Sequence, residues 1–78
     1  MEYKVEIWIY YRVADTKEFS NEKDMLKWLK SKGYITMSEF GGCFIQIYQN
    51  GQELSILDMV KRFNIWLAPI KIAEQRTY

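Results

Sequence analysis

The alternation of apolar and polar residues near the start of the chain predicts a strand, and a helix is expected to follow it. In residues 4–13, KVEIWIYYRV, every second residue is apolar, which is typical of a β-strand with one buried face. The residues expected to point inward are Val5, Ile7, Ile9, Tyr11 and Val13, and those expected to point outward are Lys4, Glu6, Trp8, Tyr10 and Arg12. A helix is expected over residues 22–32, because Ser20 or Asn21 can cap its first turn and Gly33 can end it.

The middle of the chain predicts a β-hairpin. Residues 34–39 and residues 43–49 both alternate, and Gly41 and Gly42 between them can supply the positive backbone angles of a tight connection. The side chains expected to point inward are Ile35, Met37, Cys43, Ile45 and Ile47.

The last part of the chain predicts a second helix and a final strand. Ser55 and Asp58 have the spacing of a capping box at the start of a helix over residues 56–63. Residues 65–73 are apolar on alternate positions, with a change of parity at Pro69. Because proline is tolerated at bulges and on edge strands, this last strand is expected at an edge of the sheet.

The order strand, helix, strand, strand, helix, strand predicts one α+β domain over residues 1–78 with the ferredoxin-like βαββαβ arrangement. Its four-stranded antiparallel sheet would carry two helices on one face and leave the other face open. Two other layouts are compatible with the pattern. In one, the segment TKEF (residues 16–19) pairs back onto the first strand; in the other, Asn50-Gly51 is a hairpin turn followed by a short strand over residues 52–54.

The uncovered face of that sheet is expected to be rich in aromatic rings. Aromatic residues make up 17% of the chain, more than one small core normally buries, so some rings are expected at the surface. The residues predicted to form a binding surface there are Trp8, Tyr10, Arg12, Phe44, Tyr48 and Trp66.

Charge and cysteine content narrow the classes of partner and compartment. Eleven Lys and Arg against ten Asp and Glu give a net charge of +1, whereas a nucleic-acid module usually carries a marked basic excess. The single Cys43 cannot form an intramolecular disulfide, which favours a reducing, cytoplasmic location. The apolar runs near the start are too short for a secretory signal or a membrane span. The ridge of Lys23, Lys27 and Lys30 is interpreted as an ordinary solvated helix face.

Catalytic chemistry is not expected. The chain contains no histidine, so Cys43 has no histidine as a general base and is interpreted as a small buried residue. One cysteine without histidine also argues against a zinc site, and neither GxxxxGK[ST] nor GxGxxG is present. The sequence therefore predicts a protein that is not an enzyme and has no metal or cofactor.

Two short segments resemble signatures of the RNA-recognition motif, a family with a ferredoxin-like fold. Residues 7–9, IWI, resemble the start of its first-strand signature, and residues 40–47, FGGCFIQI, resemble part of its third-strand signature. The resemblance implies that Trp8 and Phe44 stack on bases. Phe40 stands where that family has a basic residue, and Gly42 stands where it has the first exposed aromatic residue.

Two functions are therefore expected, from different classes. The leading hypothesis is a protein-binding module that acts through its aromatic sheet face, either as a homodimer or as a phage-like or mobile-element inhibitor of a host protein machine. The alternative is a module that binds single-stranded RNA or DNA through the same rings together with Lys4 and Arg12. No membrane partner is expected.

Overall fold

The described part of the chain folds as an antiparallel sheet with helices packed on it. The structure is a computed structural model, and it describes residues 2–65. In chain order these residues form β1 (Tyr3–Ile9), β2 (Arg12–Phe19), α1 (Glu22–Ser31), α2 (Tyr34–Glu39), β3 (Phe44–Gln49), β4 (Gln52–Glu53) and α3 (Ile56–Phe63).

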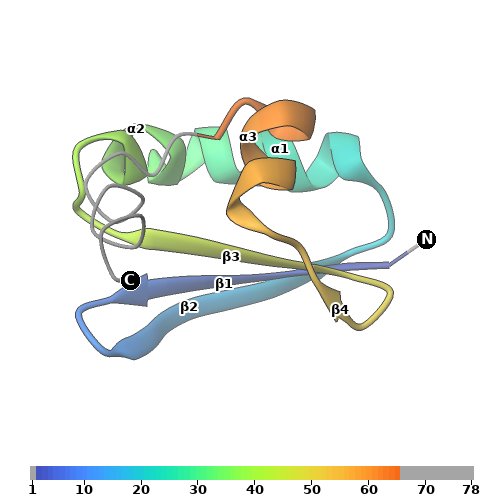
Figure 1. Ribbon diagram of the computed structural model, residues 1–78, viewed down its shortest axis with the longest axis horizontal. Coiled ribbons are helices and arrows are strands. Elements are labelled where there is room, and N and C mark those ends of the chain that lie inside the picture. Colours follow the sequence, from blue (N-terminus) through green and yellow to red (C-terminus); the bar gives the residue numbers. More distant parts are fainter. Residues whose placement is uncertain (1, 66–78) are drawn as a thin grey trace.

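The sheet has the strand order β2-β1-β3-β4, and each neighbouring pair is antiparallel. Within the described residues, all three helices lie on one face of this sheet and the other face carries none (Figure 1). The predicted α+β class and the four-stranded antiparallel sheet are confirmed. The order of the elements is not clearly that of the predicted ferredoxin-like fold, because two segments differ from the prediction.

The first difference is that the predicted strand over residues 4–13 is two strands. The chain reverses at Tyr10 and Tyr11, and β2 then pairs back along the whole of β1, from Ile9 opposite Arg12 to Tyr3 opposite Phe19. The layout in which TKEF returns to the first strand is therefore confirmed. The expectation that Tyr11 and Val13 point into the core is wrong, since both side chains are exposed.

The second difference is that residues 34–39 form the helix α2 instead of a strand. Gly41 has a φ of 78° and follows the cap residue Phe40. Its N–H donates to the carbonyl of Ser38 at 3.2 Å, and the N–H of Gly42 donates to the carbonyl of Met37 at 2.7 Å. These two bonds form a Schellman motif, so the glycine pair ends a helix and does not join two strands.

The remaining elements follow the sequence closely. Helix α1 is capped by Asn21, which accepts a hydrogen bond from the N–H of Asp24, and α3 is capped in the same way by Ser55 and the N–H of Asp58. Asn50 and Gly51, with φ of 52° and 82°, form the turn between β3 and the short β4. The hairpin alternative at Asn50-Gly51 is therefore confirmed, although its second strand has only two residues.

The core lies between the sheet and the helices. Its buried residues are Tyr3, Val5, Ile7, Met25, Leu29, Cys43, Ile45, Ile47, Met59, Phe63 and Ile65. Of the predicted last strand over residues 65–73, Ile65 belongs to this core, and the other residues, including Pro69, lie outside the described residues. Between residues 2 and 65, no helix is long and apolar enough to cross a membrane.

Candidate functional site

Three of the predicted binding residues lie together on the sheet face without helices. β1 and β3 are direct neighbours, and their register places Trp8 opposite Phe44 and Lys4 opposite Tyr48. The residues that alternate with them point into the core, so these four side chains point to the open face. The core residues are Val5 and Ile7 on β1 and Ile45 and Ile47 on β3. The structure thus brings Trp8, Phe44 and Tyr48 to the same face of the sheet.

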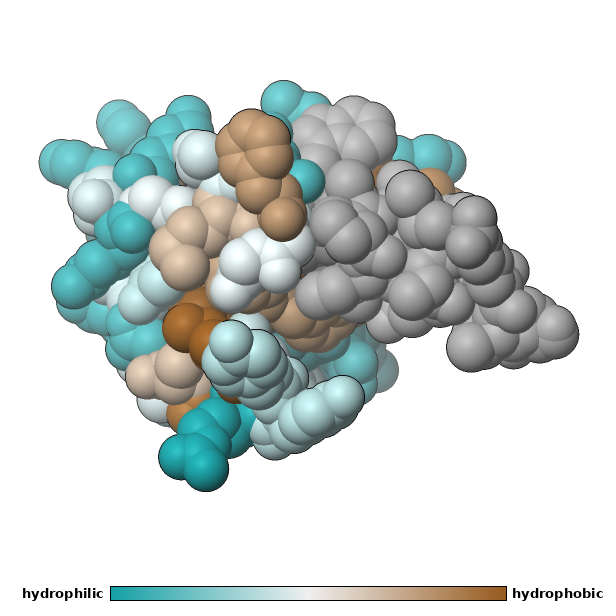
Figure 2. All heavy atoms as spheres, turned by 90° about the vertical axis from the view of Figure 1, so that its left-hand side faces the viewer, coloured by the Kyte–Doolittle hydropathy of each residue, from teal (hydrophilic) through white to brown (hydrophobic). Residues whose placement is uncertain are grey.

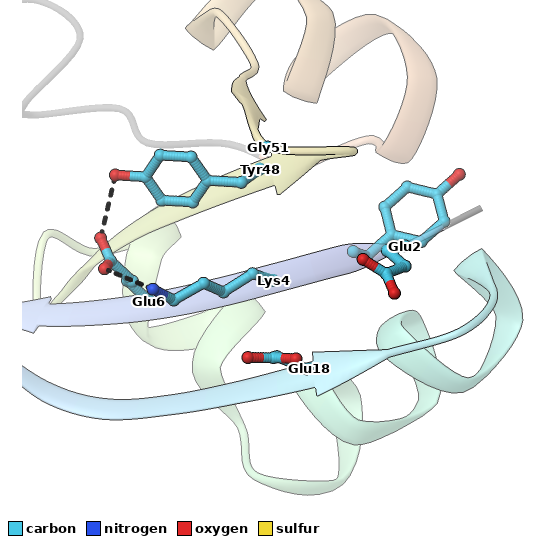
Figure 3. Close-up of a pocket in the computed structure, with 7 residues that line it drawn as sticks. Glu2, Lys4, Glu6, Glu18, Tyr48 and Gly51 are labelled. Carbon is cyan, nitrogen blue, oxygen red and sulfur yellow. Dashed lines mark hydrogen bonds and ion pairs between the residues drawn. The ribbon is translucent and has the colours of Figure 1, made fainter.

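The carboxylate of Glu6 holds two of these rings in place. Its Oε1 accepts a hydrogen bond from the Tyr48 hydroxyl at 3.1 Å and another from the Trp8 indole nitrogen at 3.3 Å. The ammonium of Lys4 lies 3.7 Å from Oε2 of the same carboxylate (Figure 3). Burial and the hydrogen bond to Glu6 raise the pKa of the Tyr48 hydroxyl, so it stays protonated as a donor. The polar groups of Trp8 and Tyr48 are thus used inside the molecule.

Gln46 closes the centre of the same face. It lies opposite Glu6 and is buried, and its amide nitrogen donates to the carbonyl oxygen of Leu54 at 3.2 Å. A buried amide with a satisfied donor stabilises the connection to β4 and is not available to a ligand. The middle of the sheet face is therefore closed by Gln46.

One end of the sheet face is a hollow of about 420 Å³ lined mainly by charged side chains. Glu2, Glu6 and Glu18 line this hollow with three carboxylates, and the ammonium of Lys4 points to that of Glu6 (Figure 3). No group of three or more Cys, Asp or Glu side chains in the described part of the chain has the arrangement of a metal site. With three acids against one lysine, this hollow would repel a phosphate backbone.

The opposite end of the molecule carries large exposed aromatic side chains. Tyr10 and Tyr11, in the turn between β1 and β2, are 92% and 96% exposed, and Phe40, at the end of α2, is 81% exposed. Val13 and Met37 beside them are also exposed. We call these five residues the aromatic end. Figure 2 looks onto this end, where apolar side chains gather above the more hydrophilic side chains of its lower edge.

The turn and the α2–β3 connection enclose a hollow of about 360 Å³. Its lining joins the tyrosines of the turn to Gly41 and Gly42, and it reaches the pair Trp8 and Phe44 on the sheet face. The rings of the aromatic end and the near end of the sheet face therefore form one continuous surface. Arg12 is the single charged residue in the tip segment, residues 9–14, and its side chain is exposed.

Tyr10 has an unfavourable backbone conformation. Its φ is 60°, in the left-handed region, where a residue with a bulky side chain is a genuine outlier. Two-residue hairpin turns need a positive φ at the first central position and normally place Gly, Asn or Asp there. The side chains of Tyr10 and Tyr11 are almost fully exposed, so contacts of these rings do little to offset this cost. Strain of this kind persists mainly where it serves a function.

The structure separates the six predicted site residues. Trp8, Phe44 and Tyr48 lie on the sheet face, whereas Tyr10 lies in the turn and Arg12 begins β2. Tyr10 and Arg12 were predicted to follow Trp8 on the outward face of one strand. They do not, because β1 ends at Ile9. Trp66 lies outside the described residues.

Sequence reasoning missed two prominent residues of the aromatic end. Tyr11 was expected in the core because the alternation continues through the turn without a Gly, Pro or Asn to interrupt it. Phe40 was placed in a hairpin connection. Its exposure follows from the helix end at Gly41, and the Gly41-Gly42 pair directly after a possible helix was the available signal.

Two other groups considered from the sequence have ordinary surroundings. Cys43 is buried, and burial raises the pKa of its thiol, so it remains the neutral thiol of a core residue. The side chains of Lys23, Lys27 and Lys30 on α1 are exposed. Neither group adds to the sites described above.

Comparison of the chain with family models, with curated proteins and with solved structures gave no match.

Proposed function

We propose that this chain is a non-enzymatic module that binds another protein through its aromatic end. The observation that carries the proposal is the pair Tyr10 and Tyr11, which are more than 90% exposed on a turn whose backbone disfavours a bulky residue. A turn selected for stability alone would have Gly or Asn at the first position. The tyrosines are therefore explained best by what their side chains contact outside this chain.

The composition of the surface supports a protein partner. Tyr, Phe, Trp, Met and Arg are enriched in protein interfaces, and the strongest single contributions come from Trp, Tyr and Arg. Tyr10, Tyr11 and Phe40 would be the anchors, Arg12 a polar contact at their edge, and the Trp8–Phe44 pair a flat border. A partner of matching chemistry would offer apolar pockets for these rings and a carboxylate for Arg12.

The acidic end of the sheet face supports a protein partner over single-stranded nucleic acid. Base stacking on Trp8 and Tyr48 requires a phosphate backbone to run along the same face, close to Glu6 and Glu18. Trp8 and Tyr48 also donate their hydrogen bonds to Glu6. Nucleic-acid binding is therefore kept as an outcome of the test.

Two further expectations belong to the proposal. The buried thiol of Cys43 fits a reducing compartment such as the cytoplasm. Inhibition of a host protein machine is one way in which such a module could act, and it stays a prediction.

The test is capture from a lysate of the source cells with the intact chain, followed by titration of the purified binding protein. The variant Tyr10→Ser/Tyr11→Ser removes the anchors, and Lys23→Ser/Lys27→Ser on α1 is the matched control. We expect the identified protein to bind the wild type and the control alike and to lose at least a hundredfold in affinity with the tyrosine variant. Equal binding to all three chains, or capture abolished by nuclease and by added salt, would contradict the proposal.

A further inference from the structure

The long edge of the sheet suggests a second way in which this chain forms contacts. β2 has eight residues and lies at the outside of the strand order, whereas the other edge, β4, has two residues. A long edge strand offers a row of backbone groups that can pair with another strand.

The backbone of β2 shows which groups face outward. The N–H of Thr16 donates to Oδ1 of Asp15, its own neighbour, at 2.9 Å, so it points away from β1. Glu18, two residues further along the same strand, has its N–H and carbonyl on the same side. Asp15 and Lys17, on either side of Thr16, lie opposite Ile7 and Val5 of β1. The outer edge is therefore regular from Asp15 to Phe19.

We propose that β2 pairs antiparallel with β2 of a second copy of this chain, with Thr16 opposite Thr16 on a two-fold axis. In a symmetric pair of this kind, a residue whose backbone groups point outward must lie opposite another such residue. Within the regular edge, this condition leaves only registers centred on a single residue.

Charge selects one of these registers. A pair centred on Asp15, Lys17 or Glu18 places that residue opposite itself, with two like charges in contact. A pair centred on Phe19, the last residue of β2, would join the two strands at that residue alone. The pair centred on Thr16 places Asp15 opposite the Lys17 of the second copy, twice, and places Glu18 opposite the uncharged Ala14. It also joins two threonines, which is a favourable cross-strand pair.

The side chains of Asp15 and Lys17 already lie where this register requires them. The hydroxyl of Tyr34 donates to Oδ2 of Asp15 at 2.7 Å and holds the carboxylate on the helix side of the edge. Lys17 lies on the same side, two residues further on, and is exposed. On pairing, the N–H of Thr16 would donate to the carbonyl of the opposing Thr16 in place of Asp15. Asp15 would keep its hydrogen bond from Tyr34 and gain an ion pair with Lys17 of the second copy.

The resulting assembly closes at two copies. Joining β2 to β2 makes one continuous sheet, and its remaining described edges are the two-residue strands β4, which are too short to extend it. The two aromatic ends would lie at opposite ends of the dimer, because the paired strands run in opposite directions. The pairing does not depend on whether the aromatic end binds a partner.

The test uses two complementary single variants of the full chain, with sedimentation equilibrium as the measurement. Asp15→Lys places lysines opposite each other, and Lys17→Asp places aspartates opposite each other. We expect the wild type to be a dimer and each variant alone to dimerise at least tenfold more weakly. Mixed in equal amounts, the two variants should form a heterodimer, because every facing pair is again of opposite charge.

Control variants and a second measurement keep the outcome decisive. Glu18→Lys, which faces Ala14, and Lys23→Asp on α1 change the charge equally and should leave the dimer intact. If Asp15→Lys does not fold without its contact to Tyr34, amide hydrogen exchange of the wild type replaces it. The N–H of Glu18 should become protected as the concentration rises. A wild-type monomer at millimolar concentration, a dimer unchanged in Lys17→Asp, or an unprotected Glu18 in the dimer would each overturn the inference.

Discussion

The two hairpin turns of this protein differ in how well their residues suit their backbone. At one end of the sheet, Asn50 and Gly51 both have positive φ, the conformation for which this dipeptide is the preferred choice. At the other end, Tyr10 has a φ of 60°, a backbone conformation that its bulky side chain disfavours. The first turn is explained by local conformation, whereas the second is not.

Side-chain contacts sharpen the contrast. The side-chain Oδ1 of Asn50 accepts a hydrogen bond from the backbone N–H of Glu2 at 2.9 Å. The backbone N–H of Asn50 donates to the carbonyl of Glu2 at 2.8 Å. Asn50 therefore joins the turn to the start of β1. The rings of Tyr10 and Tyr11 are almost fully exposed. The comparison indicates that one turn stabilises the molecule and the other presents a surface.

The largest effect is expected on binding. Replacing Tyr10 and Tyr11 together by serine should weaken partner binding at least a hundredfold, about 3 kcal/mol, which is the range of interface hot spots. The free energy of unfolding should change little, because these rings make few contacts within the fold. Titration calorimetry with the identified partner and urea unfolding of the same samples measure both quantities. A large loss of stability would show that the rings belong to the core.

A smaller effect is expected when the tyrosine turn is copied to the other end. Asn50→Tyr/Gly51→Tyr places two bulky residues at positive φ and removes the side-chain bond to Glu2. The free energy of unfolding should fall by about 2 kcal/mol. Urea unfolding measures this loss, and Leu57→Tyr, an exposed position on α3, is the control for adding a tyrosine. Unchanged stability would show that the backbone at such a turn does not penalise tyrosine.

The reverse change should stabilise the protein. Tyr10→Gly supplies the residue that this φ favours, and the free energy of unfolding should rise by about 1 kcal/mol. For a domain of this size, the melting temperature should rise by about 4–8 °C. Thermal unfolding followed by circular dichroism is the measurement, with Tyr11→Gly as the neighbouring control. A lower melting temperature in Tyr10→Gly would contradict the assignment of strain to Tyr10.

The smallest effect is expected in the pH dependence of stability, from Tyr34, whose hydroxyl makes a hydrogen bond within the fold. The hydrogen bond to Asp15, together with burial, raises the pKa of Tyr34 to about 12, from an ordinary value of about 10. Since the folded-state pKa is the higher one, this stabilisation is fully present below about pH 10 and is lost as the pH rises towards 12. Urea unfolding at pH 9, 10 and 11 should show a steeper fall for the wild type than for Tyr34→Phe. Equal slopes would contradict the structural role of this hydroxyl.

Much of the fold could be predicted from local signals that agree with the final structure. Asn21 and Ser55 cap α1 and α3, Gly33 follows the end of α1, and the alternation around Ile45 and Ile47 gives β3. In each case, the residue preference and the tertiary contacts point to the same element.

The sequence predictions fail where the local residue pattern and the tertiary contacts favour different structures. The alternation of KVEIWIYYRV continues through Tyr10 and Tyr11, so periodicity alone could not reveal a turn without turn residues. Residues 34–39 alternate like a strand, yet Gly33 before them and Gly41 after them bound a short helix whose Tyr34 reaches Asp15 on β2. The placement of Trp8, Phe44 and Tyr48 on one face follows from the alternation of residues along β1 and β3. The aromatic end could not be predicted, because it is formed by the turn and the helix end that the alternation conceals.

The measurement that tests the central claim most directly is the affinity of Tyr10→Gly for the identified partner, taken together with its melting temperature. If Tyr10 is retained for binding despite its backbone, the variant will melt at a higher temperature and bind at least tenfold more weakly than the wild type. A variant that is more stable and binds equally well would show that Tyr10 has no role in binding and would contradict the assignment of the aromatic end as the binding surface.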